Sequence, residues 1–482
     1  MSTRLLTVAV LAACLGAFPA VAAPKYSDAV TSARPTEGEY FGLYLMGRKV
    51  GFLYTHLKFV PGRDDQVSAV SEFVFKAQVG TKTSERRMKE TRTYEAKPGG
   101  RLLSFVVEQM GDGGDQTLEA TTTAQGMKVL RKRPGQPNEV LTRKASREVV
   151  EDADQARVAL KRAANVVGYV TDGMDLESYK VTTTIGESGV RTIAGVPVRV
   201  RKVTTISEKE KVPADAWFDE HGRMLEMRFG DNMRAYAESA DIAKRIDKVE
   251  VFGLTRVVMP SPAPESAHSV PGQMTLVLGG LPEKFRKSTY RQKVKTLPSD
   301  RVEVTLLAAA PAAKGKVRPL ADPNGGENLK STLVVEASNP EIVALAKSIV
   351  KDDKDAYSSA KKIIDWVATH LVKDYGSSSD RATDVLRTKK GDCTEHSLLA
   401  VALLRAVGIP SKRVDGVVYL MNDDKVPALY WHEWVEAYVG EWTQMDPTFH
   451  QHVADATHLA LGEEGGAEIT PLIGQLQVLE VR

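Results

Sequence analysis

The feature that most restricts the fold is a short segment with clearly marked ends that carries a single cysteine. Residues 393–407 are rich in good helix formers and dense in apolar residues, which predicts a largely buried helix. Asp392 stands at the N-cap position, and Gly408 with Pro410 just beyond gives the usual helix stop. Cys393 is therefore expected in the first turn, where unpaired backbone N–H groups and the helix dipole favour a thiolate.

A predicted β-hairpin follows, and its turn sets a geometric demand. Alternating residues predict a strand at 431–439 that carries His432, and after a turn at Gly440 a short strand at 442–445 leads to Asp446. A two-residue turn would place His432 and Asp446 on opposite faces, whereas a three-residue connection or a bulge makes them a near-diagonal pair on one face. An aspartate that orients the imidazole needs the second arrangement. We therefore expect a bulged or odd-length turn at Gly440.

Four motifs occur in order between about Asn339 and Gln451. They are Gly-Asp-Cys at the helix start, Leu-Arg-Ala-Val-Gly-Ile-Pro at its end, His-x-Trp-Val-Glu-x-Tyr on the strand and Trp-x-x-x-Asp-Pro-Thr after the turn. This order and spacing resemble the bacterial transglutaminase-like superfamily. The resemblance implies a papain-like α+β fold with the nucleophile on a helix and the histidine and aspartate on an antiparallel sheet. Carried over position by position, it implies Cys393 as nucleophile, His432 as base and Asp446 as orienting acid.

Residues of these types imply acyl transfer through a thioester. Cys393 would attack a carboxamide or peptide carbonyl, His432 would move the thiol proton to the leaving amine, and Asp446 would fix the imidazole tautomer. The Cys393 backbone N–H is one candidate donor to the oxyanion, and Tyr375 or Trp366 could be the second. We expect a cysteine peptidase or amidase that hydrolyses proteins or cell-wall peptides, because water is the abundant acceptor. Two alternatives stay open: protein-glutamine transamidation (cross-linking), and a catalytically silent binding or assembly module of the cell envelope.

The first residues, 1–22, have the pattern of a secretory signal peptide. Arg4 precedes an apolar run at 5–18, and small residues then suit a signal peptidase, with cleavage expected after Ala22. The alternative is a bacterial lipobox, Leu-Ala-Ala-Cys, in which Cys14 would be lipidated. Both interpretations predict an exported protein, periplasmic or extracellular. No other segment is long and apolar enough for a transmembrane helix.

Cysteine usage bears on the same question. The chain of 482 residues has two cysteines, so removal of the leader leaves Cys393 as a single thiol. Exported proteins usually pair their cysteines or omit them, and a lone thiol is therefore either reactive or an intermolecular partner. The alternative is a small buried hydrophobic residue. The position of Cys393 at a helix start favours a reactive thiol, because a structural cysteine would more naturally lie mid-helix on the apolar face.

Charge and motif content limit the expected partners. The net charge of +3 is small, with acids and bases mixed along the chain, which gives no reason to expect nucleic acid. No CxxC or HExxH pattern occurs, so neither a metal nor a cofactor is expected. The expected partner is a protein or peptide substrate, with envelope association left open. We expect Glu395 and His396 to be polar helix positions near the site, and His450, His452 and His458 to lie at the surface.

The rest of the chain predicts an α+β protein of several parts. Residues 23–258 are expected to be a mainly antiparallel β domain with a helix over 149–167. A proline-rich linker at 259–272 leads to a small β-rich segment at 273–338, whose strands include one at 331–336. The transglutaminase-like catalytic domain is expected over 339–482, with helices beginning at Asn339 and near Ala356.

Overall fold

The computed structural model describes residues 35–482 with short gaps. The gaps are 80–81, 98–99, 112–114, 145–150, 161–163, 174–175, 194, 210–211, 262, 265–271, 311–315, 376–378, 423 and 464–466. The predicted signal peptide, with Cys14, lies outside the described residues, as does most of the predicted linker at 259–272. Among the helices within the described ranges, none combines the length and the apolar character needed to cross a membrane.

The N-terminal part is one large sheet, as the alternating sequence predicts. Within the described ranges it contains fourteen antiparallel strands in the order β8 to β1 and then β14 to β9. Chain neighbours pair within β1–β8 and within β9–β14, while β8 and β9 are the two ends of the sheet. The two halves join where β1 pairs with β14, from Tyr40 opposite Glu238 to Leu45 opposite Met233. The strands are β1 (Glu39–Leu45), β2 (Arg48–Val60), β3 (Arg63–Val79), β4 (Lys82–Glu95), β5 (Leu102–Gly111), β6 (Gln116–Thr123), β7 (Gly126–Lys132), β8 (Glu139–Arg143), β9 (Asn165–Thr171), β10 (Ser178–Ile193), β11 (Val196–Ser207), β12 (Ala214–Phe218), β13 (Met224–Phe229) and β14 (Met233–Glu238).

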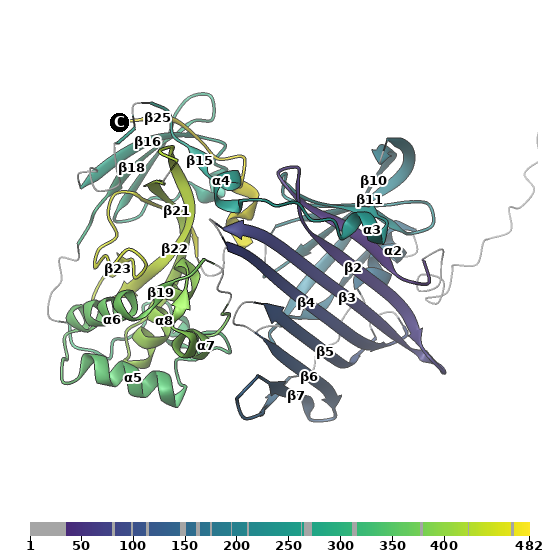
Figure 1. Ribbon diagram of the computed structural model, residues 1–482, viewed down its shortest axis with the longest axis horizontal. Coiled ribbons are helices and arrows are strands. Elements are labelled where there is room, and N and C mark those ends of the chain that lie inside the picture. The colour runs from purple at the N-terminus through teal and green to yellow at the C-terminus, as the bar shows by residue number, and fades with distance from the viewer. Residues whose placement is uncertain are drawn as a thin grey trace, which may run out of the picture.

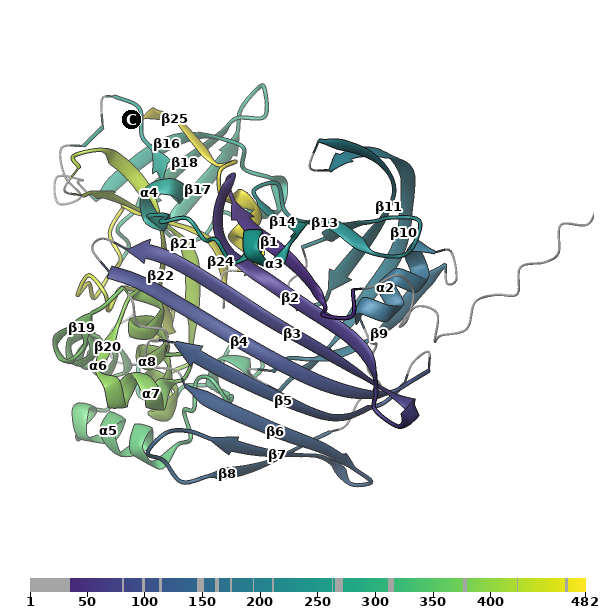
Figure 2. The ribbon, with the colours of Figure 1, turned by 45° about the vertical axis from the view of Figure 1, so that its right-hand side comes forward.

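This sheet curls, so that its far end returns to its middle. Figure 2 shows β2–β8 as one broad face, with α2 (Glu151–Ala159) beside β9–β11 at the other end of the sheet. Arg92 on β4 donates from Nη2 to the Thr171 carbonyl at the end of β9, at 2.7 Å. Val158 and Ala159 of α2 are buried in a hydrophobic cluster with Phe218 and other strand residues. Apolar residues of α2 and of strands β9–β13 thus form the core at this end of the sheet.

The helix predicted over 149–167 is shorter than expected. Helix α2 ends at Ala159, and residues 165–167 belong to strand β9. Val166 and Val167 pair with Thr183 and Thr182 of β10, so the β-branched run joins the sheet instead of extending the helix. The helical spacing of apolar residues was therefore correct for only part of the segment.

The C-terminal part combines two sheets with a group of helices (Figure 1). Within the described ranges, the larger sheet has the order β15-β22-β21-β24, with β23 paired to β22, and the smaller has the order β17-β18-β16-β25. Their strands are β15 (Val257–Val258), β16 (Gln273–Gly279), β17 (Gln292–Thr296), β18 (Val302–Leu307), β21 (Ser411–Met421), β22 (Pro427–Tyr438), β23 (Trp442–Met445), β24 (His458–Glu463) and β25 (Gln477–Val481). The short parallel pair is β19 (Val372–Lys373) with β20 (Lys390–Gly391). The sheet that contains β21 and β22 and the sheet that contains β16 and β18 both contribute residues to one hydrophobic cluster.

The helices begin where the capping residues predict. Asn339 accepts a hydrogen bond from the Glu341 N–H at 2.9 Å and starts α5, and Asp355 caps α6 through the Ser358 N–H at 2.7 Å. The central helix α8 packs against the other three and against β22. The helices of this part are α5 (Pro340–Val350), α6 (Ala356–His370), α7 (Ala382–Thr388) and α8 (Cys393–Ala406), and those before it are α3 (Ala240–Ala243) and α4 (Val251–Thr255).

The segment predicted at 273–338 shares its sheet with the end of the chain. Strand β16 pairs on one side with β18 and on the other with β25, so residues from 273 onward and the last residues of the chain form one sheet. The strand predicted at 331–336 was wrong, because this stretch is a series of turns. Thr332 Oγ1 accepts the backbone N–H groups of Val334 and Val335, which closes a turn in place of a strand.

The two parts meet through polar contacts beside the start of α8. Lys82 at the start of β4 lies 2.9 Å from Asp374, and Arg86 lies 3.4 Å from Asp380. Arg131 on β7 reaches Glu336 at 3.5 Å. Figure 1 shows the ends of β3 and β4 directed towards the C-terminal part.

Candidate active site

Cys393 begins helix α8, as the sequence predicts. The Asp392 carboxylate accepts the Thr394 N–H at 2.8 Å, and the Glu395 carboxyl accepts the Asp392 N–H at 2.8 Å. This reciprocal capping box satisfies free donors of the first turn and fixes where the helix starts. The position of Cys393 is thereby set by two local hydrogen bonds and by the packing of α8 on β22.

The turn at Gly440 has the odd length that the sequence demands. Tyr438 pairs with Trp442, which leaves residues 439–441 as a three-residue connection between β22 and β23. Gly440 has a φ of 112°, in the left-handed region that favours glycine. The prediction of a bulged or odd-length turn is confirmed.

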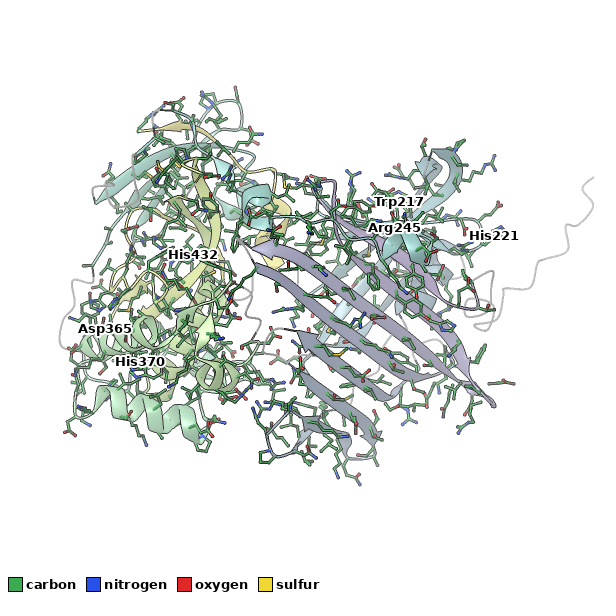
Figure 3. All side chains as sticks on the ribbon, in the orientation of Figure 1. Trp217, His221, Arg245, Asp365, His370 and His432 are labelled. Carbon is green, nitrogen blue, oxygen red and sulfur yellow. The ribbon has the colours of Figure 1, made fainter. Side chains whose placement is uncertain are left out.

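This register brings His432 and Asp446 into direct contact. His432 Nε2 lies 2.7 Å from Asp446 Oδ2, and both side chains are buried. Figure 3 labels His432 on the long strand above the helices. With Nε2 on the carboxylate, Nδ1 is the nitrogen left for a proton exchange with another group.

Asp446 is held on both carboxylate oxygens. Oδ1 accepts the backbone N–H groups of Thr448 at 2.6 Å and Phe449 at 3.0 Å, and Oδ2 receives His432 and His458. Burial acts to raise the pKa of Asp446, but the charges and hydrogen bonds of the two histidines outweigh it and hold that pKa far below its usual range. Asp446 is therefore an ionised, fixed acceptor.

His458 was expected at the surface, and that expectation was wrong. It lies at the start of β24, is fully buried, and places Nε2 3.0 Å from Asp446 Oδ2. Its Nδ1 lies 3.1 Å from Asp455 Oδ1. Burial lowers the pKa of His458, but the bonds to the two aspartates reverse this and raise it. Sequence reasoning missed His458 because only the pairing of β24 with β21, far along the chain, brings it to Asp446.

The thiol of Cys393 lies beside Glu433, the residue that follows His432. Cys393 is partly exposed, and the Glu433 backbone N–H donates a hydrogen bond to its sulfur. Burial first, then the charges of Asp392 and Glu433, raise the pKa of the Cys393 thiol well above its ordinary value. This direction is opposite to the one expected from the helix start. Desolvation and the nearby acids raise this pKa, while the hydrogen bond from the Glu433 backbone acts to lower it.

Only one of the two candidate oxyanion donors lies near the cysteine. Burial first, and then the charges of Cys393 and Asp392, raise the pKa of Tyr375. Trp366 lies instead on α6, stacked on His370 with ring centroids 4.3 Å apart. No contact places Trp366 at the cysteine among the described residues.

Glu395 and His396 are buried, which the sequence did not predict. Glu395 accepts the N–H groups of Asp392 and Ser379, and burial, followed by the Asp392 charge, raises its pKa to about 9. His396 Nδ1 bonds the Asp392 carbonyl at 2.6 Å, and burial lowers its pKa. Its Nε2 is buried without a hydrogen-bond partner among the described residues. The apolar density of α8 already indicated a buried helix, so the signal for burying these two residues was present in the sequence.

Two groups of side chains could offer metal ligands within the described ranges. One is His432, Asp446 and His458, which is fully buried, and the other is Asp365, His450 and His452, which is open to solvent. In the buried group both Asp446 oxygens and both His458 nitrogens already have hydrogen-bond partners. That arrangement suits a hydrogen-bonded set of charges better than a metal site.

Comparisons with known proteins agree with this geometry. Residues 343–447 match the transglutaminase-like superfamily, and the match includes Cys393, His432 and Asp446. This stretch is a transglutaminase-like core. The predicted family and the predicted fold class, a core of this kind after an antiparallel β region, are confirmed.

Individual relatives are more distant. An uncharacterized protein of Mycobacterium leprae is 27% identical over 117 residues, which are 23% of this chain and 41% of that protein. A structure from Cytophaga hutchinsonii called a "putative cysteine protease" has a TM-score of 0.30 and 16% identity, and covers 48% of this chain and 86% of that one. A β-barrel-like protein of unknown function from Brucella abortus has a TM-score of 0.31 and 14% identity, and covers 42% of this chain and 94% of that one.

Proposed function

We propose that this chain is an exported thiol enzyme that transfers acyl groups through Cys393, His432 and Asp446. The observation that carries the proposal is the buried bond between His432 Nε2 and Asp446 Oδ2, on a strand packed against the helix that Cys393 begins. The transglutaminase-like match over 343–447 supports a thiol enzyme family. Export rests on the leader pattern of residues 1–22.

The raised pKa of Cys393 determines the order of proton movement. The thiol stays protonated at rest, so His432 acts as general base during the attack and takes the proton on Nδ1. The sulfur bonds to the carbonyl carbon, and the carbonyl electrons move onto oxygen. The backbone N–H of Cys393 and the hydroxyl of Tyr375 are the proposed donors to that oxyanion. Asp446 stabilises the imidazolium that forms.

Collapse of this intermediate expels the amine and leaves a thioester. The leaving nitrogen takes the proton from His432, and His432 then removes a proton from the acceptor that attacks the thioester. With water as acceptor the products are a carboxylic acid and the free thiol. We propose hydrolysis of peptide or amide bonds in proteins or cell-wall peptides as the reaction, with association with the cell envelope as part of the proposal. An amine acceptor would give cross-linking by the same steps.

The experiment uses the chain without its predicted leader, peptide mixtures of defined sequence, and a primary amine in half of the reactions. Mass spectrometry distinguishes hydrolysed peptides from amine adducts and detects a thioester on the Cys393 peptide. Cys393→Ala should abolish both products, and His432→Ala should slow them by about 10²-fold or more. His221→Ala is the matched control, because His221 is exposed in the turn between β12 and β13. Product formation unchanged in Cys393→Ala, or no acyl-enzyme with any mixture, would contradict the proposal.

A further inference from the structure

Helix α6 and the loop after β23 bring two histidines to one carboxylate oxygen. His450 Nε2 and His452 Nε2 lie 2.7 Å and 2.6 Å from Asp365 Oδ1. The imidazole rings are nearly perpendicular, with centroids 6.1 Å apart. Figure 3 labels Asp365 on α6, on the outer side of the C-terminal part. None of these residues takes part in the proposed acyl transfer.

We propose that Asp365, His450 and His452 form a binding site for a divalent transition-metal ion, with zinc as the representative. Two imidazole nitrogens and one carboxylate oxygen are a donor set that such ions prefer. The three potential ligand atoms all lie within 4.8 Å of one another. Side-chain exposure of 45%, 50% and 39% leaves room for water as a further ligand.

Only a small adjustment separates the observed contacts from a coordination shell. Ligand atoms about 2.0–2.1 Å from a tetrahedral ion stand roughly 3.3 Å apart. The two nitrogen–oxygen separations are at present hydrogen-bond distances. An increase of roughly 0.6 Å in each needs only small rotations of side chains that are 39–50% exposed.

The backbone of the loop directs both histidines towards α6. His450 has a φ of 57°, a left-handed conformation that a residue with a Cβ adopts rarely and at a cost. The loop is closed by a reciprocal pair of backbone hydrogen bonds between Asp446 and Gln451, at 2.8 Å and 2.7 Å. His370, the histidine at the end of α6, bonds the Trp366 carbonyl through Nδ1 and is not part of the group.

A bound ion would tie this loop to α6 close to the candidate active site. The loop begins at Asp446, and its Thr448 and Phe449 N–H groups hold the Asp446 carboxylate. The Phe449 ring lies with its centroid 4.9 Å from that of His432. A bound ion would therefore restrict the motion of the loop that positions Asp446 and covers one face of the His432 ring.

The test measures metal binding and does not depend on catalysis. The full chain without its leader carries Cys393→Ser, which removes the thiol as a competing ligand. Competition of zinc with a chromophoric chelator gives stoichiometry and affinity, and cobalt in place of zinc gives a visible absorption band that reports on its ligands. We expect one zinc per chain. His450→Ala, His452→Ala and Asp365→Asn should each weaken binding by about tenfold or more, and His221→Ala should leave it unchanged.

Three results would overturn the proposal. They are no zinc binding by the Cys393→Ser chain, binding with unchanged affinity in both His450→Ala and His452→Ala, and binding that is lost only in His432→Ala. The last would place the ion at the buried group instead. Thermal unfolding of each variant without metal verifies that it is folded, which is expected because all three substituted side chains are solvent-accessible.

Discussion

His458 Nε2 lies 3.0 Å from the same Asp446 oxygen that His432 Nε2 approaches at 2.7 Å. The other nitrogen of His458 faces the Asp455 carboxylate at 3.1 Å. Bonds to two carboxylates require a hydrogen on each ring nitrogen, so His458 is an imidazolium. A buried cation thus stands between two buried or half-buried anions and compensates the charge that Asp446 carries beside His432.

Replacing His458 by glutamine should remove this charge while keeping one donor for Asp446. Because the folded-state pKa of His458 is raised above 6.5, its stabilisation is fully present below about pH 6.5 and is lost as pH rises through the folded pKa. The variant should be less stable at pH 6, and the difference in unfolding free energy should shrink towards alkaline pH. Urea unfolding at several pH values measures this.

The control for this variant is His221→Gln, an exposed histidine for which no pH-dependent difference is expected. A difference between wild type and His458→Gln that stays constant from pH 6 to alkaline pH would show that His458 is neutral in the fold.

Asp392 should slow the reaction of Cys393 with a haloacetamide. Its carboxylate is the second cause, after burial, of the raised thiol pKa. Asp392→Asn keeps an N-cap of similar quality and removes the charge. The alkylation rate of the Cys393 peptide, followed by mass spectrometry, should therefore increase at fixed pH, and its pH profile should move to lower pH. In the wild type, the alkylation rate should rise with a midpoint at a pH above the pKa of a free thiol, which is about 8.5.

A matched control exists at another helix. Asp355 caps α6 through the Ser358 N–H, so Asp355→Asn makes the same chemical change at an N-cap of another helix. Equal profiles for Asp392→Asn and wild type would mean that the charge of Asp392 does not act on the thiol.

Local features of the site could be predicted from the sequence, and long-range ones could not. The capping box at Asp392 and the turn at Gly440 depend on residues within a few positions, and both were predicted. His458 reaches Asp446 only because β24 pairs with β21, and no local pattern specifies that pairing. The hydrogen bond that Glu395 accepts from the Ser379 N–H likewise joins residues of two separate segments, and no local pattern specifies it.

The same division holds for the fold. Alternation predicted the antiparallel strands of the N-terminal part, but the pairing of β1 with β14 joins residues about two hundred positions apart. The strand predicted at 331–336 failed because the Thr332 hydroxyl offers the backbone a competing turn. The β-prone run Leu333-Val334-Val335 favoured a strand, but the Thr332 hydroxyl accepts two of the backbone N–H groups that a strand partner would use.

Arg291 is a further residue that no local pattern indicates, and replacing it should destabilise the protein. It is buried and donates to Gln444 Oε1 at 2.6 Å and to the carbonyls of His458, Ala454 and Leu307 at 3.1–3.2 Å. Lysine has one nitrogen and cannot reach acceptors spread around a planar guanidinium. Arg291→Lys should lower the free energy of unfolding by about 2–4 kcal/mol, since two or more charge-assisted bonds are lost.

Urea unfolding measures this loss, with Arg301→Lys as the control. Arg301 precedes β18, and its side chain is 41% exposed, so a change within about 0.5 kcal/mol is expected there. Equal stabilities for the two variants would mean that the bonds of Arg291 contribute little.

Glu395 should make the protein less stable as pH rises. Its pKa is raised from 4.5 to about 9, chiefly by burial, so between these values the folded chain holds a proton that the unfolded chain has lost. The free energy of unfolding then falls with pH, by at most about 1.4 kcal/mol per unit for one group.

Glu395→Gln cannot titrate, but its amide replaces one acceptor oxygen, so it should be less stable than wild type at pH 5. Urea unfolding should show that gap closing towards pH 9, whereas Glu341→Gln, at an exposed first-turn position of α5, should show no such change. A gap that widens with pH would mean that Glu395 is ionised in the fold, and that the cap at Cys393 holds two carboxylates side by side.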